Sequence, residues 1–276
     1  FRYYGNDYSI YFESLWHWIM FTTPQELQCL KNSGEILSEI LSAIKKSILD
    51  GEREIYKLDD LAAKMLIELD ARSFKGYKPD FADDAYEYNI CASVNNEIVH
   101  GLPSKDKILK DGDIVSIDMA VEHNGWYADS AFTIGIGEIS ESNKNLILTA
   151  EDCFNKALEI CQVGNTLGDV GHIINETAKA RGLSIAYALS GHGIGKALHE
   201  DPYVKNFGLP NEGLIIEPGM SFCIEPMLID GDHMISEYFE GKTDGWTLYT
   251  IDGGNSSHYE HTIAITENGP LVLTRH

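Results

Sequence analysis

Residues 114–134 read IVSIDMAVEHNGWYADSAFTI, in which two runs of alternating side chains flank an Asn124-Gly125 pair. An Asn-Gly pair between such runs is a strong signal for a β-hairpin with a two-residue turn. In that hairpin Asp118 and Asp129 occupy the same face as diagonal neighbours, with their Cα atoms about 7–8 Å apart. One ion between the two carboxylates is geometrically reasonable. By themselves, however, two acids on a hairpin are equally consistent with an ordinary solvent-exposed surface.

Two more acids lie in strand-like segments later in the chain, Glu225 within residues 220–225 and Glu260 within residues 258–265. Because side chains alternate across a strand, each of the four acids is expected in mid-strand on a face with small or polar neighbours. The opposite face then points into a core and carries Ile117, Met119, Phe132, Phe222, Ile224, Ile263 and Ile265. Four carboxylates converging in a cleft repel one another and take up protons, and two divalent cations would cancel about four charges. Separate, solvated acids avoid the conflict equally well, so the pattern leaves both alternatives open.

A histidine between glycines is a candidate nitrogen ligand: His192, within residues 191–195, which read GHGIG. Glycines on both sides allow close backbone approach and let the ring project from a loop. Four carboxylates with one imidazole suit Mn, Co, Fe or Zn better than Mg. His100 and His199 are further candidates, although each of these histidines by itself is also consistent with a purely structural role.

The rest of the chain predicts an α+β fold in which the same order of elements occurs twice. Thr23 and Pro24 predict the N-cap and the first residue of a long helix. Periodic apolar residues predict further helices at about 58–70, 142–161 and 166–181. Each pair of helices precedes antiparallel strands, so two related halves are expected to face each other within a single domain, residues 21–276. Residues 1–20 show no clear period and are expected to be an extension of unknown role.

The composition is that of a soluble globular protein, with 43% hydrophobic and 23% charged residues. No apolar run approaches the roughly 18–20 residues of a membrane span, so no membrane association is expected. The net charge of −22 argues against nucleic acids and anionic membranes as partners, and it favours cationic ligands such as free amino groups. Five scattered cysteines without CxxC spacing, and the lack of a signal peptide, favour reduced thiols and a cytoplasmic location.

Six stretches, in this order and at these separations, resemble type I methionine aminopeptidases over roughly residues 21–275. The stretches are 91–103, 109–118, 125–129, 191–202, 219–226 and 257–262. The resemblance implies the pita-bread fold, in which two pseudo-symmetric halves of antiparallel strands are flanked by outer helices. It also implies a metalloaminopeptidase that removes the initiator methionine from the N-termini of newly made polypeptides.

The resemblance further implies a role for each matching residue. Two divalent metal ions (Co, Mn, Fe or Zn) would be held by Asp118, Asp129, His192, Glu225 and Glu260, with Asp129 and Glu260 bridging. A hydroxide between the metals would attack the first peptide carbonyl, and Glu225 would shuttle the proton. His100 and His199 would act on the substrate around the scissile amide. Since these histidines crowd the space beyond that bond, a small second residue is expected.

The pocket for the methionine side chain is expected to be aromatic and lined with sulfur, which suits a flexible thioether. The matching positions hold Tyr77, Cys91 and Trp246, with Phe74 and Tyr86 as candidate additions. Each aromatic residue is also consistent with ordinary core packing. Two departures from the family pattern, Leu198 in place of an aromatic residue and a long acidic loop at 78–88, are expected to reshape the pocket or its entrance.

Two alternatives use the same fold. An Xaa-Pro aminopeptidase or prolidase usually has a large extra N-terminal domain, whereas only about twenty residues here are unmatched. A non-catalytic pita-bread interaction protein normally loses metal ligands, and this chain has an expected residue type at every such position. The type II form has a long insertion that the interval from His199 to Glu225 is too short to contain. We therefore expect a catalytic protein, and a monomer.

Overall fold

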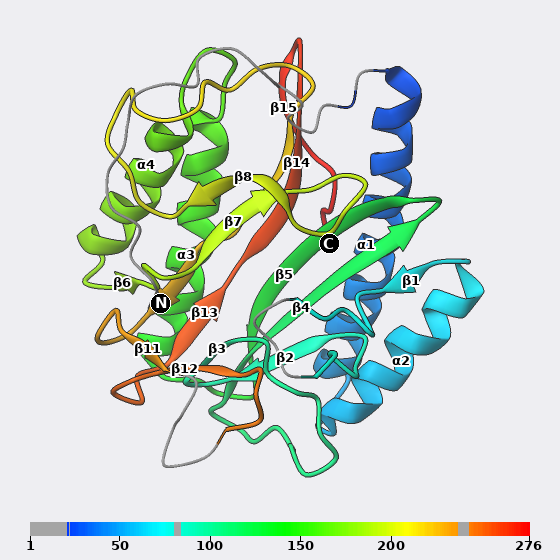
Figure 1. The fold of residues 1–276 in the computed structure, drawn as a ribbon. Helices are drawn as coiled ribbons and strands as arrows, with labels where there is room; N and C mark the ends of the chain where they lie inside the picture. Colours follow the sequence, from blue (N-terminus) through cyan, green and yellow to red (C-terminus); the bar gives the residue numbers. More distant parts are fainter. Residues whose placement is uncertain (1–20, 22, 80–83, 237–242) are drawn as a thin grey trace.

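A computed structural model of the chain describes residues 21, 23–79, 84–236 and 243–276. This part of the chain contains two pairs of helices, each followed by antiparallel strands, as the sequence predicts. The helices are α1 (Pro24–Leu49), α2 (Ile55–Glu68), α3 (Glu141–Ile160) and α4 (Leu167–Ala180). Figure 1 shows the two pairs at opposite sides of the molecule. The expected extension, residues 1–20, lies outside the described residues, and the single domain over 21–276 stays a prediction.

The first two helices begin for different physical reasons. Thr23 accepts a hydrogen bond from the backbone N–H of Glu26 at 3.2 Å, and Pro24 is the first residue of α1, which confirms the predicted start. Helix α2 begins three residues earlier than predicted, and no described side chain caps it. The backbone N–H of Ile55 donates instead to the backbone oxygen of Lys107. A tertiary contact, which local sequence does not reveal, therefore sets this boundary.

Nine of the described strands form one antiparallel sheet that joins the two halves, in the order β1–β4–β5–β14–β9–β7–β8, with β2 beside β4 and β15 beside β14. The bounds are β1 (Arg72–Ser73), β2 (Cys91–Val94), β4 (Ile114–His123), β5 (Trp126–Gly135), β7 (Ser190–Gly193), β8 (Glu200–Lys205), β9 (Ser221–Ile224), β14 (Glu260–Thr266) and β15 (Gly269–Val272). The halves meet where β5 pairs with β14.

Two smaller sheets contain the other described strands, in the orders β13–β10–β6 and β11–β12–β3. Their bounds are β3 (Glu97–Val99), β6 (Ser184–Ile185), β10 (Met227–Ile229), β11 (Ile235–Ser236), β12 (Leu248–Thr250) and β13 (Ser256–His258). These sheets contribute Val99, Met227 and Leu248 to the wall of the cavity described below. They thus close one side of the site that the large sheet carries.

The predicted hairpin is confirmed in its register. Strands β4 and β5 pair without a break from His123 opposite Trp126 to Ile114 opposite Gly135. Asn124 and Gly125 both have positive φ, 54° and 80°, as the two central residues of a type I′ turn require. The turn therefore fixes which residues of β4 and β5 face each other.

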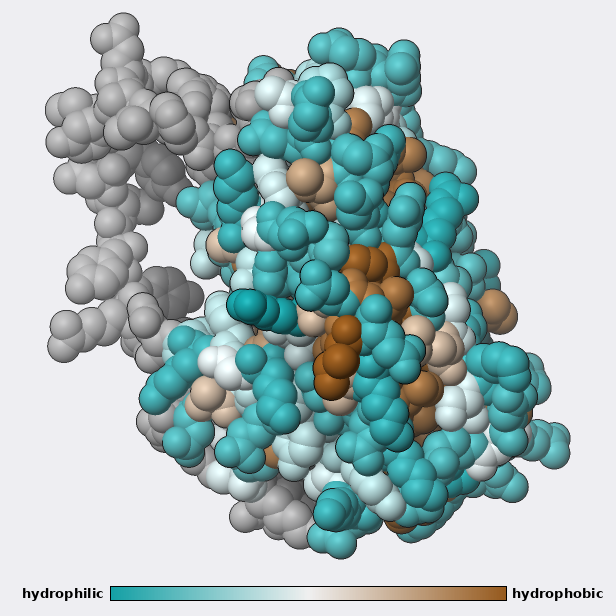
Figure 2. All heavy atoms as spheres, turned by 90° about the vertical axis from the view of Figure 1, so that its right-hand side faces the viewer, coloured by the Kyte–Doolittle hydropathy of each residue, from teal (hydrophilic) through white to brown (hydrophobic). Residues whose placement is uncertain are grey.

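The bulky side of the large sheet packs against the helices. Residues of β4 and β5 form one core with α1 and α2, and residues of β9 and β14 form another with α3 and α4. All seven apolar residues predicted to point into a core are at most 2% exposed. Figure 2 views the molecule from the side of α1 and α2, where hydrophilic side chains cover most of the surface. Among the described residues, no helix has both the length and the apolar composition needed to cross a bilayer.

The two glycines beside His192 are required by close approach of neighbouring backbone. A Cβ atom on Gly191 would lie 2.3 Å from the backbone oxygen of Cys223, and one on Gly193 would lie 2.1 Å from that of Asp201. Backbone oxygens of paired strands cannot move aside as a flexible side chain does. The predicted close approach is confirmed, but the predicted loop is wrong, because His192 lies within strand β7.

We expect Gly193→Ala to lower the free energy of unfolding by about 1–3 kcal/mol, because the added methyl group forces β7 away from β8. Urea denaturation followed by circular dichroism measures the change. Ser190→Ala, on the same strand at a half-buried position, is the control and should change stability by less than about 0.5 kcal/mol. Unaltered stability of the Gly193→Ala protein would contradict the close packing of these strands.

Candidate functional site

Two neighbouring rows of residues cross the large sheet, and the predicted metal ligands lie in them. In the first row Cys91 pairs with Asp118, Asp118 with Ala131, and Ala131 with Glu260. Glu225 directly follows the last paired residue of β9 and so extends this row beyond Glu260. Paired residues point to the same face of a sheet, and the small side chain of Ala131 leaves space between its two acidic neighbours. Three carboxyl groups from three strands therefore converge.

The second row adds an acid and an imidazole. Asp129 and Thr262 exchange two hydrogen bonds of 2.8 Å through the threonine hydroxyl, which donates to the backbone oxygen and accepts from the backbone N–H. Thr262 pairs with Cys223 on β9, and a ring nitrogen of His192 lies within 4.8 Å of donor atoms of Cys223 and Glu260. This row lies beside the first, so residues far apart in the sequence share one centre.

The donor atoms of the two rows are close enough to share ions. Carboxylate oxygens of Asp118, Asp129 and Glu260 lie within 4.8 Å of one another. Nε2 of His192 is 3.6 Å from Oε1 of Glu225 and 3.9 Å from Oδ2 of Asp129. The other ring nitrogen, Nδ1, lies 2.9 Å from the backbone oxygen of Gly193, a contact that directs Nε2 toward the acids. The structure thus brings all five predicted ligands together.

Burial raises the pKa of every carboxyl group in this centre, and the charges of neighbouring acids raise those of Asp118, Asp129 and Glu260 further. Burial, followed by the charge of Glu225, raises the pKa of Asp129 to about 7. Burial is also the main reason why the pKa values of Asp118, Glu225 and Glu260 rise well above their usual range. Burial lowers the pKa of His192 to about 3, so its ring is neutral near pH 7 and offers a lone pair rather than a positive charge.

This donor set fits divalent metal ions. Oδ1 of Asp129 and Oε1 of Glu260 are buried and have no hydrogen-bond partner among the described residues. Such atoms are costly unless something binds them. Oxygen donors with an imidazole are ligands that transition-metal ions accept, and positive charge would remove the repulsion between the acids.

The strand positions of two acids differ from the prediction. Glu225 lies just beyond the end of β9, and Glu260 is the first residue of β14, so neither is in mid-strand. Pro226 follows Glu225 and has no N–H to donate to a neighbouring strand, which explains why β9 ends there. The backbone oxygen of Glu225 accepts a hydrogen bond of 2.9 Å from Nδ2 of Asn206. The predicted alternation nevertheless gives the correct face for both acids.

One histidine at the centre is absent from the predicted set. His258, at the end of β13, is 2% exposed, and its Nε2 lies 3.6 Å from Glu225 and 3.5 Å from Glu260. Burial lowers its pKa to about 4, so the ring is neutral near pH 7. A signal was available in the sequence, since His258 and Glu260 are two residues apart and extended backbone puts such residues on one side.

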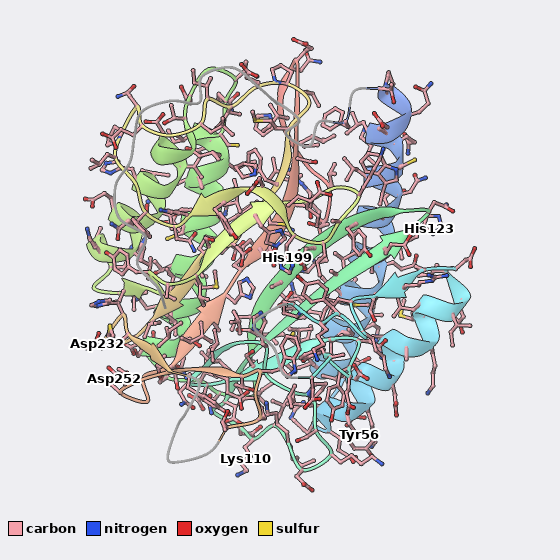
Figure 3. The ribbon with its side chains drawn as sticks, viewed as in Figure 1. Tyr56, Lys110, His123, His199, Asp232 and Asp252 are labelled. Carbon is pink, nitrogen blue, oxygen red and sulfur yellow. The ribbon has the colours of Figure 1, made fainter. Side chains whose placement is uncertain are left out.

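A cavity of about 1000 Å³ opens above the centre, and the other predicted histidines line it. His199 is exposed to this cavity, its ring 4.3 Å from that of His192 between centroids, and its Nδ1 is 3.0 Å from the hydroxyl of Tyr77. Figure 3 shows His199 in the middle of the molecule, in front of the large sheet. His100 lines the same cavity with φ of 60°, a conformation that costs energy for a residue with a side chain. Burial lowers the pKa of His100 to about 4.

The predicted pocket residues gather on another part of the cavity wall. Phe74, Tyr77, Tyr86, Cys91 and Trp246 all line it, together with Leu198. The ring of Tyr86 contacts those of Phe74 and Trp246, with centroids 5.2 and 5.0 Å away. Tyr86 is 1% exposed, and its hydroxyl lies within 3.2 Å of two backbone oxygens. Tyr86 therefore supports the pocket mainly from behind, as the core-packing alternative expects.

Comparisons with known proteins agree with this geometry. The sequence profile of metallopeptidase family M24 matches residues 28–267. Methionine aminopeptidase 1 of Bacillus subtilis is 39% identical over 258 residues, which cover 93% of this chain and 99% of that protein. The crystal structure of methionine aminopeptidase from Thermotoga maritima has a TM-score of 0.86 and 38% identity, covering 94% of this chain and 100% of that one.

A more distant similarity bears on the fold alone. Prolidase from Pyrococcus furiosus has a TM-score of 0.70 and 21% identity, and the match covers 94% of this chain but 66% of that one. The expected α+β pita-bread fold is confirmed by these structures. The family profile matches most of the chain, and the relatives are similar over nearly their whole length. The chain therefore belongs to metallopeptidase family M24 and, within it, to the methionine aminopeptidases.

Proposed function

We propose that this chain holds two divalent metal ions at the buried centre and uses them to remove the initiator methionine from polypeptides whose second residue is small. The membership of a metallopeptidase family already makes it an enzyme that uses divalent metal. One observation supports the finer proposal most: four carboxyl groups and His192 converge at the floor of a cavity, with buried oxygens that lack any described partner.

The five predicted ligands, Asp118, Asp129, His192, Glu225 and Glu260, would hold the ions. Glu260 belongs to every cluster of metal-donor groups found among the described residues, which supports its role as a ligand shared by both ions. Asp129 lies near both Asp118 and His192, which supports the same role for Asp129. Co, Mn, Fe and Zn are all compatible with these donors. Bound there, a pair of such ions would supply a water molecule acidic enough to act as hydroxide near neutral pH.

The remaining chemistry belongs to side chains of the chain. Glu225, whose pKa burial raises, would take up the proton of the attacking water. His199 would polarise the carbonyl of the first residue and stabilise the negative charge that develops on its oxygen. The Tyr77 hydroxyl, 3.0 Å from Nδ1 of His199, would hold that ring in position. His100 would bind and protonate the departing amide nitrogen.

Selectivity would come from the cavity wall. Tyr77, Cys91 and Trp246, with Phe74, would enclose the methionine side chain, and the acidic centre would attract the free α-amine. His100 and His199 would leave room for only a small second residue. Leu198 lines the same cavity and would shape its entrance; of the loop 78–88, residues 80–83 lie outside the described part.

We further propose that the chain acts as a monomer in the cytoplasm on newly made polypeptides and binds no nucleic acid. All five cysteines lie in the described part, and none forms a disulfide, which supports a reducing compartment. The net charge of −22 supports the lack of nucleic-acid binding.

Peptide cleavage tests the function against both alternatives. The metal-reconstituted protein should release the first residue from Met-Ala-Ser but not from Leu-Ala-Ser or Ala-Pro-Ser, since the pocket suits an unbranched thioether. Mass spectrometry of the products measures this. Preferential cleavage of Ala-Pro-Ser would instead identify an Xaa-Pro aminopeptidase. If none of the three peptides is cleaved by protein that demonstrably holds metal, the non-catalytic alternative stands.

We expect Asp118→Asn to lose metal affinity and turnover together, each by at least about 100-fold, because a neutral amide replaces a charged ligand. Isothermal titration with Co²⁺ and Met-Ala-Ser hydrolysis measure the two effects. Asp106→Asn, the same charge change at an exposed position, is the control and should leave both unchanged. An Asp118→Asn protein with native affinity and native activity would refute this ligand set.

Stabilisation by metal should increase as the pH rises from 6 to 8. The pKa of Asp129 is about 7 in the folded protein and about 3.9 in the unfolded chain. In metal-free protein, protonation of Asp129 therefore stabilises the fold fully below about pH 4, and this stabilisation is lost as the pH rises through 7. Bound ions remove the repulsion that causes this loss. Ionisation of histidines in the unfolded chain changes the stability of metal-loaded and metal-free protein equally, so it cancels in the difference between the two. The measurement is the difference in melting temperature between metal-loaded and chelator-treated protein at pH 6, 7 and 8; a constant or shrinking difference would contradict the prediction.

A further inference from the structure

His258 has the properties of a metal ligand, although the five proposed ligands do not include it. The side chain is 2% exposed, and neither ring nitrogen has a hydrogen-bond partner among the described residues. The backbone of His258 is fixed independently, because its N–H donates to the hydroxyl of Thr133 at 3.0 Å and its carbonyl oxygen accepts from that hydroxyl at 2.9 Å. The ring is therefore held at the centre by its strand, with a buried nitrogen that needs a partner.

The position of this nitrogen matches that of the ligand His192. Nε2 of His258 lies 3.6 Å from Oε2 of Glu225, and Nε2 of His192 lies 3.6 Å from Oε1 of the same carboxyl group. Nε2 of His258 is also 3.5 Å from Oε2 of Glu260, and all three residues form one cluster of metal donors. The carboxyl group of Glu225 thus has one imidazole beside each of its oxygens.

These separations are those of ligands around one ion rather than of direct hydrogen bonds. An N–H···O hydrogen bond to a carboxylate requires about 2.7–3.2 Å, which is shorter than either contact of His258. Two atoms each bound about 2.1 Å from one metal ion at a near-tetrahedral angle lie about 3.4 Å apart. The contacts at 3.5 and 3.6 Å correspond to the second case.

We propose that His258 is a sixth ligand of the metal centre, so that two imidazoles, those of His192 and His258, bind there together with the four carboxyl groups. The inference rests on the proposed function in one respect, since it takes two divalent ions to bind at this centre. A second imidazole changes the metal preference, because imidazole suits Zn and Fe whereas carboxylate-only sites suit Mn, and sites with nitrogen donors generally bind Co more tightly than Mn. The ion nearest His258 should therefore discriminate against Mn more strongly than the acids alone would.

X-ray absorption at the cobalt edge tests this without any substitution. In native protein loaded with two equivalents of Co²⁺, outer-shell scattering should correspond to two imidazoles per pair of cobalt ions. One imidazole per pair would overturn the proposal and leave the proposed function standing. Failure of native protein to bind Co²⁺ at all would overturn the proposed function as well, so the two failures are distinguishable.

His258→Gln provides a second test, in which an amide of similar length replaces the ring. Titration should show one of the two Co²⁺ sites weakened at least ten-fold and the other changed less than three-fold. The loss of affinity at the weakened site should be smaller for Mn²⁺ than for Co²⁺. His123→Gln is the matched control, because His123 lies at the tip of the β4–β5 hairpin, away from His199 (Figure 3), and is not among the residues that line the cavity. Both sites should keep native affinity in this variant.

A folded His258→Gln protein that binds two Co²⁺ ions with native affinity, and with the native Co-to-Mn ratio, would overturn the proposal. Circular dichroism and the melting temperature of the metal-free variant establish that it is folded. Should the variant not fold, the scattering measurement on native protein still decides. A structural role alone would lower the melting temperature without changing the number of imidazoles bound to cobalt.

Discussion

The burial of four carboxyl groups beside one another is the constraint on which this structure depends. Such groups repel, and their pKa values rise until they are protonated or until positive charge binds them. The sheet makes this arrangement possible by placing Ala131 between Asp118 and Glu260, where a larger side chain would fill the space. The helices contribute from the other face, since their two cores hold the strands in register. An unfavourable centre is thus maintained by favourable packing elsewhere.

The cavity opens outward from this acidic centre, and different kinds of side chain line it at increasing distance from the acids. Asp129 and the other acids form its floor, His192 and His199 lie next to each other above them, and Tyr77 contacts His199 in turn. Aromatic residues continue the wall from there, so that the part suited to an apolar side chain adjoins the part suited to a charged amine. On the proposed function, this geometry would hold the first peptide bond of a polypeptide, rather than an internal one, over the acids. The proposed selectivity for chain ends and the proposed chemistry would therefore both follow from one arrangement.

Much of this was predictable from the sequence where local rules apply. The Asn124-Gly125 turn fixes the register of β4 and β5, and alternation then gives the face of each acid. The end of β9 follows from Pro226, a local signal, whereas the start of β14 at Glu260 depends on its pairing with β5 and was not predictable. The two-residue spacing of His258 and Glu260 indicates that they share one side, but the approach of His258 to Glu225 depends on the pairing of β10 with β13, which the sequence does not reveal. The roles of individual ligands remain predictions drawn from the family resemblance.

The pairing of β5 with β14 has a consequence for how the protein becomes active. Asp118 and Asp129 come from the first half of the chain, whereas His192, Glu225 and Glu260 come from the second. A chain in which β14 is not yet made already contains four of the five proposed ligands, but it lacks Glu260 and the strand that pairs with both β5 and β9. On the proposed ligand set, the metal centre is therefore complete only once β14 has been made and has paired with its neighbours in both halves. A copy truncated before β14 would lack the one residue that belongs to every cluster of metal-donor groups in the described part of the chain.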